Sequence, residues 1–222
     1  AGEPLLVRTV RSLALAGCKR VVIVVGHGAE AVESDFRAAY TGDVEIIFAV
    51  NTRYELSNGL SVLAARPHTP GDFVLTMADH VLGAEVMAIA AEHTPPAGGA
   101  TLLVDYKLNT IFDMDDATKV LATADQRIEA IGKQIATYNC IDTGVFICTQ
   151  ALMDAIEATY AAHGDASLSH GVATLSGSGR MTVRDIGDGF WQDVDTPEML
   201  AHAEAMLAQR AHHTAPNVTV SP

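Results

Sequence analysis

The chain has 222 residues, with 14 Lys or Arg against 27 Asp or Glu, and its formal net charge is -13 at pH 7. This length suits one α/β domain with a substantial core. The acidic balance excludes a basic surface for nucleic acid and disfavours attraction to an anionic membrane. No apolar run approaches the roughly 20 residues of a membrane-spanning helix, and no signal-peptide pattern is present, so we expect no stable membrane insertion.

The three cysteines, Cys18, Cys140 and Cys148, are odd in number and show no Cys-x-x-Cys spacing. This pattern argues against a disulfide framework and against a structural zinc site. We therefore expect reduced cysteines, packed as small core residues, in a cytoplasmic protein.

The first half of the chain alternates between helical and strand-like segments, which is typical of right-handed crossovers onto a parallel sheet. Within the strand expected at 73–77, Val74, Leu75 and Met77 form an apolar run without polar alternation, so we expect it to be buried on both faces. The patterns predict helices over 5–16, 29–39, 60–66 and 84–93, and strands over 21–25, 44–50, 73–77 and 100–104.

Beyond Val104 the pattern changes to short β-like runs between acidic turns, which predicts an antiparallel insertion at about 106–138. Thr196 as N-cap, with Pro197 and Glu198 behind it, predicts a last helix that runs to about Gln209. The other elements expected here are strands over 119–121, 127–131, 141–148 and 181–183 and helices over 152–162 and 167–176.

These elements predict a single domain over residues 1–209, followed by a tail over residues 210–222. The expected fold is α/β, with three αβα layers around a Rossmann-like, mostly parallel sheet and a small antiparallel β insertion.

Asp79 follows the strand expected at 73–77. In open α/β sheets the carboxyl ends of the strands border the ligand-binding crevice, so this acid could hold a metal or reach a substrate. The alternative is that Asp79 caps a following helix or turn.

A second acidic segment, Asp193-Val194-Asp195, follows another strand-like run. A hard cation such as Mg²⁺ prefers one or two carboxylates, so Asp79 and Asp195 form a candidate pair of metal ligands. Asp193 could replace Asp195, because strand alternation sends both acids to the side opposite Val194. Alternatively, Asp195 caps the last helix and Asp193 faces solvent.

Other polar features carry weaker signals. Asn58-Gly59 is typical of a turn, Gly26-His27-Gly28 lacks the third glycine of a dinucleotide motif, and no P-loop motif occurs. Lys133 follows an expected strand, where it could bind an anion or be a solvated surface charge. His80 is either a general base or metal ligand, or a partly buried histidine whose hydrogen bonds are satisfied.

Taken together, five segments resemble the nucleotidyltransferases that join a nucleoside triphosphate to a phosphorylated sugar or alcohol, and among these the inositol-1-phosphate cytidylyltransferase branch is the most similar. The resemblance covers residues 1 to about 209. The segments are Gly2-Glu3-Pro4-Leu5-Leu6, Tyr54-Glu55-Leu56-Ser57-Asn58-Gly59-Leu60-Ser61, Met77-Ala78-Asp79-His80, Asp142-Thr143-Gly144-Val145-Phe146 and Trp191-Gln192-Asp193-Val194-Asp195-Thr196-Pro197-Glu198.

The resemblance implies Mg²⁺-dependent transfer of CMP from CTP to a small phosphorylated alcohol, with inositol 1-phosphate as the expected acceptor and pyrophosphate as the by-product. Phosphocholine, a phosphonate or a sugar 1-phosphate are alternative acceptors. The resemblance implies that the catalytic residues are Asp79, Lys133 and Asp195. It also implies that the metal ligands are Asp79 and Asp195. The residues that it implies contact the nucleotide are Asn58, Gly59, Ala78 and Asp79, and those that it implies contact the acceptor are Lys133, Asp142, Thr143 and Gly144.

One departure from the family pattern concerns its glycine-rich signature loop, which would lie just upstream of Gly2. We expect the full protein to have this loop, which would wrap the triphosphate, and the present chain to be inactive alone. Two other classes of function stay open: a metal-dependent phosphate-ester hydrolase built on Asp79, His80 and Asp193, and a non-catalytic nucleotide-binding module. The oligomeric state is not predicted.

Overall fold

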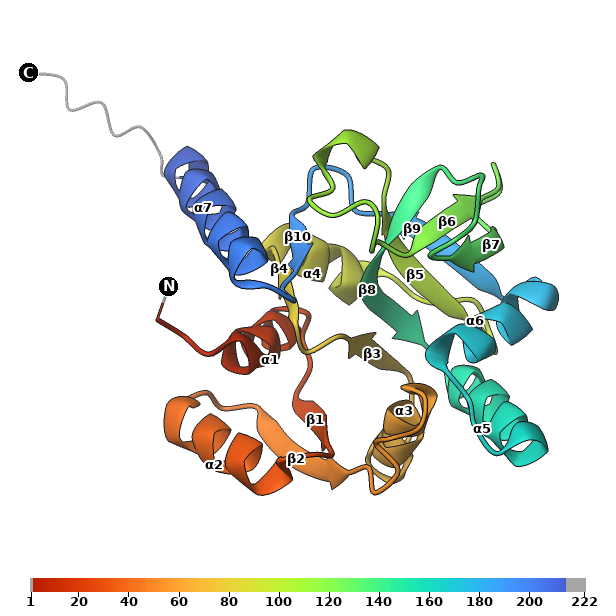
Figure 1. Ribbon diagram of the computed structural model, residues 1–222, viewed down its shortest axis with the longest axis horizontal. Coiled ribbons are helices and arrows are strands. Elements are labelled where there is room, and N and C mark those ends of the chain that lie inside the picture. Colours follow the sequence, from red (N-terminus) through yellow and green to blue (C-terminus); the bar gives the residue numbers. More distant parts are fainter. Residues whose placement is uncertain (1, 215–222) are drawn as a thin grey trace, which may run out of the picture.

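The computed structural model describes residues 2–214, and helices and strands alternate in it as far as residue 76, beyond which consecutive strands also occur (Figure 1). The helices are α1 (Leu5–Leu15), α2 (Ala29–Ala39), α3 (Gly59–Ala65), α4 (Ala84–Glu92), α5 (Ala151–His163), α6 (Leu168–Gly177) and α7 (Pro197–Thr214), with short 3₁₀ turns at Arg66–His68 and Leu108–Thr110. The strands are β1 (Arg20–Val25), β2 (Glu45–Val50), β3 (Phe73–Thr76), β4 (His80–Leu82), β5 (Ala100–Asp105), β6 (Lys119–Ala122), β7 (Ile128–Gly132), β8 (Cys140–Cys148), β9 (Met181–Asp185) and β10 (Trp191–Asp193).

The long strand β8 organises the larger sheet, whose order is β7-β6-β8-β5-β9. It runs antiparallel to β5 on one side, and β5 pairs in parallel with β9. On its other side β8 pairs antiparallel with β6 at Cys140 and Ile141, and with β3 at residues 145–148. Since β3 and β5 both oppose β8, they run in the same direction.

Two hydrophobic clusters lie on the opposite faces of this sheet, and strand alternation decides which side chains enter each. Leu102 and Phe146 pack with α3, α5 and α6 on one face, while Leu103 and Val145 pack with α1, α2 and α4 on the other. Each strand therefore needs apolar residues on both faces, as expected for a sheet between helix layers. The predicted α/β class with Rossmann-like layers is confirmed, and the strand pairing is mixed.

The predicted burial of residues 73–77 on both faces is wrong. Strand β3 ends at Thr76, and all four of its residues are only half-buried. β1 and β2 form a separate parallel pair, and within residues 2–214 no strand pairs with the edge of β3 opposite β8. A cavity opens there instead, so the apolar side chains of β3 are not fully covered.

Three further elements differ from the predictions. β4 was not predicted; it pairs antiparallel with β10. β6 and β7 form the expected antiparallel pair, but β6 also joins β8, so the insertion extends the main sheet. α7 continues to Thr214 rather than ending near Gln209, so residues 210–214 are not a tail; residues 215–222 of the predicted tail lie outside the described range.

Two expectations about the chain's chemistry are confirmed. Thr196 caps α7, because its Oγ1 accepts a hydrogen bond from the Met199 N–H at 3.2 Å. Cys18, Cys140 and Cys148 are all free thiols, and Cys140 and Cys148 are buried as expected, whereas Cys18 is only half-buried. Among the helices of residues 2–214, none is long and apolar enough to span a bilayer.

Candidate active site

The two acidic segments singled out in the sequence meet beyond the end of β3. Asp79 lies in a turn between β3 and β4, and its carbonyl oxygen accepts a hydrogen bond from the Val194 N–H at 3.0 Å. In the antiparallel pair of β4 and β10, Asp193 stands opposite His80. The N-cap of the next helix, α4, is Gly83, so the alternative that Asp79 caps a helix is excluded.

His80 is held between these segments and β8. Its Nδ1 lies 2.9 Å from the Thr143 carbonyl oxygen, its Nε2 lies 3.7 Å from Asp79 Oδ1, and its side chain is 13% exposed. Gly144 permits this approach, because a Cβ at that position would lie 2.4 Å from His80 Cε1 and the backbone φ is +74°. His80 is therefore a partly buried histidine with a fixed orientation, as one of the two interpretations predicted.

Three carboxylates form a group that could hold a cation: Asp116, Asp193 and Asp195 offer oxygens that all lie within 4.8 Å of one another. Burial raises the pKa of Asp193; His80 lowers it, and the negative charges of Asp195 and Asp116 raise it. A bound cation would neutralise this repulsion, and carboxylate oxygens are the ligands that Mg²⁺ prefers. Asp193 and Asp195 both belong to this group, whereas the sequence analysis treated them as alternatives. Asp79 is not one of the three, and its metal role stays a prediction.

Sequence reasoning missed Asp116, because the run 113–116 was interpreted only as an acidic turn. The ammonium of Lys119 fixes this turn, donating hydrogen bonds to the carbonyl oxygens of Met114 at 2.8 Å and Ala117 at 3.3 Å. It also reaches the Lys133 carbonyl oxygen at 3.2 Å. The turn is thereby tied to the end of β7, and this contact could not be predicted because the residues are far apart in the sequence.

Lys133 lies at the end of β7, as predicted, and its Nζ is 2.6 Å from Asp116 Oδ1. The structure therefore brings the predicted catalytic lysine to the acidic cluster. Since both side chains are about half exposed, this ion pair is weakened by solvent and can be exchanged for an anionic ligand.

The segment 142–144 forms the β8 side of the site. The Gly144 N–H donates a hydrogen bond to Asp142 Oδ1 at 2.7 Å. Desolvation raises the pKa of Asp142 to about 6, although this N–H and the nearby His80 both lower it. Thr143 faces elsewhere: its hydroxyl donates to the Leu103 carbonyl oxygen at 2.8 Å and is fully buried. Of the predicted acceptor contacts, Thr143 can thus act only through its backbone.

Asn58 and Gly59, the predicted nucleotide contacts, link α3 to α6. Asn58 Oδ1 accepts a hydrogen bond from the Leu168 N–H at 2.9 Å. Gly59 is buried so closely that an added Cβ would lie 2.4 Å from the Ala166 carbonyl oxygen. Both residues have a structural role that the sequence did not reveal, and their contact with a nucleotide stays a prediction.

Asp105 was also missed. It is 3% exposed, accepts a hydrogen bond from the Trp191 indole N–H at 3.0 Å and pairs with Lys107 Nζ at 2.8 Å. This carboxylate ties β5 to β10 and so supports the Asp193–Asp195 segment. The signal was present, because Asp105 ends the apolar run 100–104 in the same way that Asp79 follows 73–77.

The first turns of α1 complete the surroundings of Asp79. The buried hydroxyl of Thr9 lies 3.0 Å from the Leu5 carbonyl oxygen and 3.3 Å from the Ala78 carbonyl oxygen, so it links the helix to the turn. Ala78, a predicted nucleotide contact, is thus positioned by α1. Arg8, which precedes Thr9 in α1, has a buried Nε without a hydrogen-bond partner.

Solved structures share this fold. The inositol-1-phosphate CTP transferase from T. maritima superimposes with a TM-score of 0.77 at 29% identity, covering 91% of this chain and 82% of that one. UDP-glucose pyrophosphorylase in complex with UDP-glucose gives a TM-score of 0.76 at 14% identity, which is a likeness of fold alone. No family model matches the chain.

This fold, with its cluster of acids, defines the class, and the chain belongs to the nucleotidyltransferase family. Within it, the sequence is 31% identical over 95% of the chain to the bifunctional IPC transferase and DIPP synthase of Thermococcus kodakarensis, and 30% identical over the same share to that of Aquifex aeolicus. The chain spans about half the length of these curated relatives, 46% in both cases. Members of the family use a divalent metal ion.

Proposed function

We propose that this chain is a cytidylyltransferase that transfers CMP from CTP to inositol 1-phosphate and releases pyrophosphate. The observation that carries the proposal is that Asp116, Asp193 and Asp195 lie close together. Lys133 forms an ion pair with Asp116, and the backbone of Asp79 is hydrogen-bonded to Val194, between the other two acids. The names of the relatives support the choice of nucleotide and acceptor, since they include an inositol-1-phosphate CTP transferase and IPC transferases.

The acid cluster fits a divalent cation, for which we propose Mg²⁺. Asp193 and Asp195 would hold it, with Asp116 and Asp79 as the adjoining acids, because hard oxygen ligands suit this ion and its remaining positions suit water and phosphate oxygens. When bound, the ion would supply positive charge to offset the negative charge that builds up on the reacting phosphate.

The reaction needs positioned substrates more than a protein nucleophile. An oxygen of the acceptor phosphate would form a bond to the α-phosphorus of CTP, while the bond from that phosphorus to the oxygen bridging to the β-phosphorus breaks. Lys133 would exchange its ion pair with Asp116 for the acceptor phosphate. His80, fixed by Thr143, would keep the Asp79 turn beside the 193–195 segment.

The proposed substrates are small and soluble, and we place the protein in the cytoplasm. Three free cysteines, two of them buried, support a reducing compartment. The net charge of -13 disfavours nucleic acid as a partner.

The direct test measures pyrophosphate release with each of the four nucleoside triphosphates in turn, using the protein with its natural N-terminus. Each nucleotide is combined with inositol 1-phosphate, phosphocholine, glucose 1-phosphate or a simple phosphonate. We expect turnover with CTP and inositol 1-phosphate. Turnover with another pair would reassign the substrates, phosphate release without nucleotide would favour a hydrolase, and CTP binding without turnover would favour a non-catalytic module.

Asp79→Asn tests whether Asp79, in the turn between β3 and β4, belongs to the active site. We expect kcat to fall on the order of a hundredfold or more, because losing charge at a metal site costs several kcal/mol of transition-state stabilisation. Asp35→Asn, an exposed substitution on α2, is the matched control and should leave kcat unchanged. Near-normal turnover by Asp79→Asn would remove this residue from the site.

A further inference from the structure

Asp105, the last residue of β5, is buried more deeply than any other charged residue of residues 2–210. Both of its carboxylate oxygens are occupied. Oδ2 accepts the Trp191 indole N–H at 3.0 Å, while Oδ1 accepts the Lys107 backbone N–H at 2.7 Å and lies 2.8 Å from Lys107 Nζ. A buried carboxylate contributes little net stability even when it is paired, because its desolvation offsets the attraction. The two segments that it joins explain its position better than stability does.

One of these segments is the loop 106–117, which carries one acid of the cluster. Lys107 is held at its start by Asp105, and its Nζ also donates to a carbonyl oxygen in the β9–β10 connection at 2.5 Å. The Lys107 carbonyl oxygen in turn accepts two hydrogen bonds from Thr110, from its N–H at 3.0 Å and from its hydroxyl at 2.8 Å. Asp105 therefore fixes the first turn of the loop that ends at the acidic turn.

The other segment is β10, which leads to the remaining two acids. Trp191 precedes Asp193 by two residues, so both side chains lie on the same face of the β4–β10 pair. His80 stands opposite Asp193 on that face, and its ring centroid lies 5.8 Å from the Trp191 ring. The indole thus packs beside the histidine that contacts the Asp79 turn, and Asp105 holds the indole by its N–H.

We propose that Asp105 is a positioning residue for the candidate cation site. From one buried carboxylate it fixes the loop of Asp116 relative to the segment of Asp193 and Asp195, although it is not one of these three acids. The three carboxylates repel one another in the cation-free protein, so without this link the Asp116 loop would move away from the other two acids. The inference rests on the proposed function and adds a residue that supports its cation site without belonging to it.

Asp105→Asn tests this role, because an amide has one acceptor oxygen and can serve the indole or the Lys107 groups but not both. Calorimetric titration with MgCl₂ measures Kd at a temperature where every variant is folded. We expect Kd for Mg²⁺ to rise about tenfold or more. Asp185→Asn removes an exposed carboxylate at the end of the neighbouring strand β9, opposite Val104. It controls for lost charge and should keep Kd within about twofold of wild type.

Two further variants separate positioning from a general loss of stability. Gly171→Ala should loosen the packing of α6 on α5, because the added Cβ would lie 2.6 Å from Ile156 Cγ1, yet it should keep the wild-type Kd for Mg²⁺. Trp191→Phe keeps an aromatic ring but removes the indole N–H, so it should raise Kd. Because Trp191→Phe and Asp105→Asn break the same link, the double variant should lose less affinity than the product of the two single losses. An unchanged Kd in Asp105→Asn, or an equal loss in Gly171→Ala, would overturn the proposal.

A measurement without any cation distinguishes failure of this role from failure of the proposed function. The chain has one tryptophan, so NMR shows a single indole N–H signal, whose hydrogen–deuterium exchange can be followed together with that of the Lys107 and Val194 amides. We expect exchange at these three groups to be at least about tenfold faster in Asp105→Asn than in Asp185→Asn. If the wild type binds no Mg²⁺, the proposed cation site is wrong, and these rates still decide whether Asp105 holds the two segments. Equal rates in the two variants would overturn its positioning role.

Discussion

Asp142 shows how one residue can make the stability of the site depend on pH. Desolvation raises its pKa to about 6, above the ordinary aspartate value of 3.8, against the opposing effects of the Gly144 N–H and His80. The folded protein therefore holds a proton that the unfolded chain loses, and the free energy of unfolding falls as pH rises from about 4 to about 6. The ionised carboxylate destabilises the fold above this window.

We predict that Asp142→Asn removes this dependence. The amide stays neutral, and its oxygen can still accept the Gly144 N–H. The stability of the variant relative to wild type should rise by up to about 3 kcal/mol between about pH 4 and pH 7, the equivalent of about two pKa units. Urea unfolding of variant and wild type at several pH values measures this difference in the free energy of unfolding, with the exposed Asp115→Asn as control. A constant difference between variant and wild type would mean that Asp142 titrates normally.

At the scale of elements, the packing of α3 against α5 and α6 depends on Gly59. An added Cβ would lie 2.4 Å from the Ala166 carbonyl oxygen and 2.9 Å from Ile156 Cγ2. We predict that Gly59→Ala lowers the free energy of unfolding by about 1–3 kcal/mol, because an overpacked core must shift backbone. Gly71→Ala is the matched control, since its Cβ would meet nothing within 4 Å; it should change stability by less than about 0.5 kcal/mol. Equal effects in thermal or urea unfolding would contradict the packing argument.

Asn58 allows the structural and binding roles of the α3–α6 link to be separated. Its Oδ1 serves the Leu168 N–H, while its amide group is a donor that a nucleotide could use. We predict that Asn58→Asp keeps stability within about 0.5 kcal/mol, because the carboxylate still accepts that bond at a helix N-terminus. If the amide contacts CTP, KM for CTP should rise about tenfold. An unchanged KM would leave Asn58 with the structural role alone.

Elements that depend on local pattern were predictable, and contacts between them were not. Helix α2 and the cap at Thr196 follow from periodicity and capping chemistry, and both are confirmed. Asp116 was missed because its partners, Lys133 and the 193–195 segment, come from distant positions that only the folded insertion brings together. A single sequence shows which acids follow strands, but it does not show which strand ends meet.

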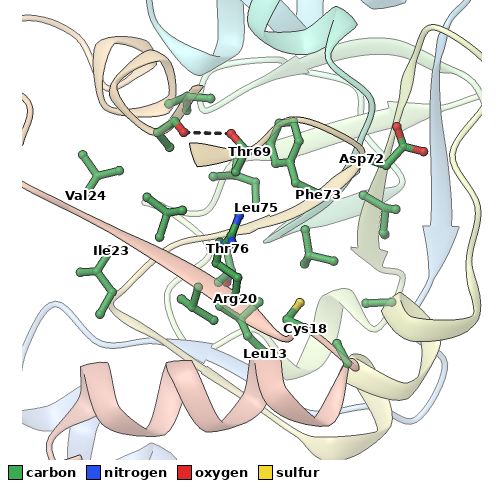
Figure 2. Close-up of a pocket in the computed structure, with 18 of the residues that line it drawn as sticks. Leu13, Cys18, Arg20, Ile23, Val24, Thr69, Asp72, Phe73, Leu75 and Thr76 are labelled. Atoms are coloured by element: carbon green, nitrogen blue, oxygen red, sulfur yellow. Dashed lines mark hydrogen bonds between the residues drawn. The ribbon is translucent and has the colours of Figure 1, made fainter. Parts of the chain in front are cut away.

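At the scale of the whole molecule, apolar runs predicted the layers but not the strand order. The apolar run that predicted full burial of β3 instead borders the cavity along its free edge (Figure 2), so its residues are only half-buried. The charge of -13 is also a whole-molecule property, because it favours the unfolded chain through self-repulsion. Salt screens the repulsion between charges that lie farther apart than the Debye length, about 8 Å at physiological ionic strength.

A bound divalent cation should stabilise the fold more than this general screening does. We predict that MgCl₂ raises Tm by about 5 °C more than NaCl at the same ionic strength, because a ligand at a hundred times its Kd contributes about 2.7 kcal/mol. Asp195→Asn should lose this extra increment, since it removes one of the three clustered carboxylates, while Asp35→Asn should keep it. The increments, not the absolute Tm values, are compared, because any lost negative charge relieves repulsion. An equal Mg²⁺ increment in both variants would place the cation elsewhere on this acidic surface.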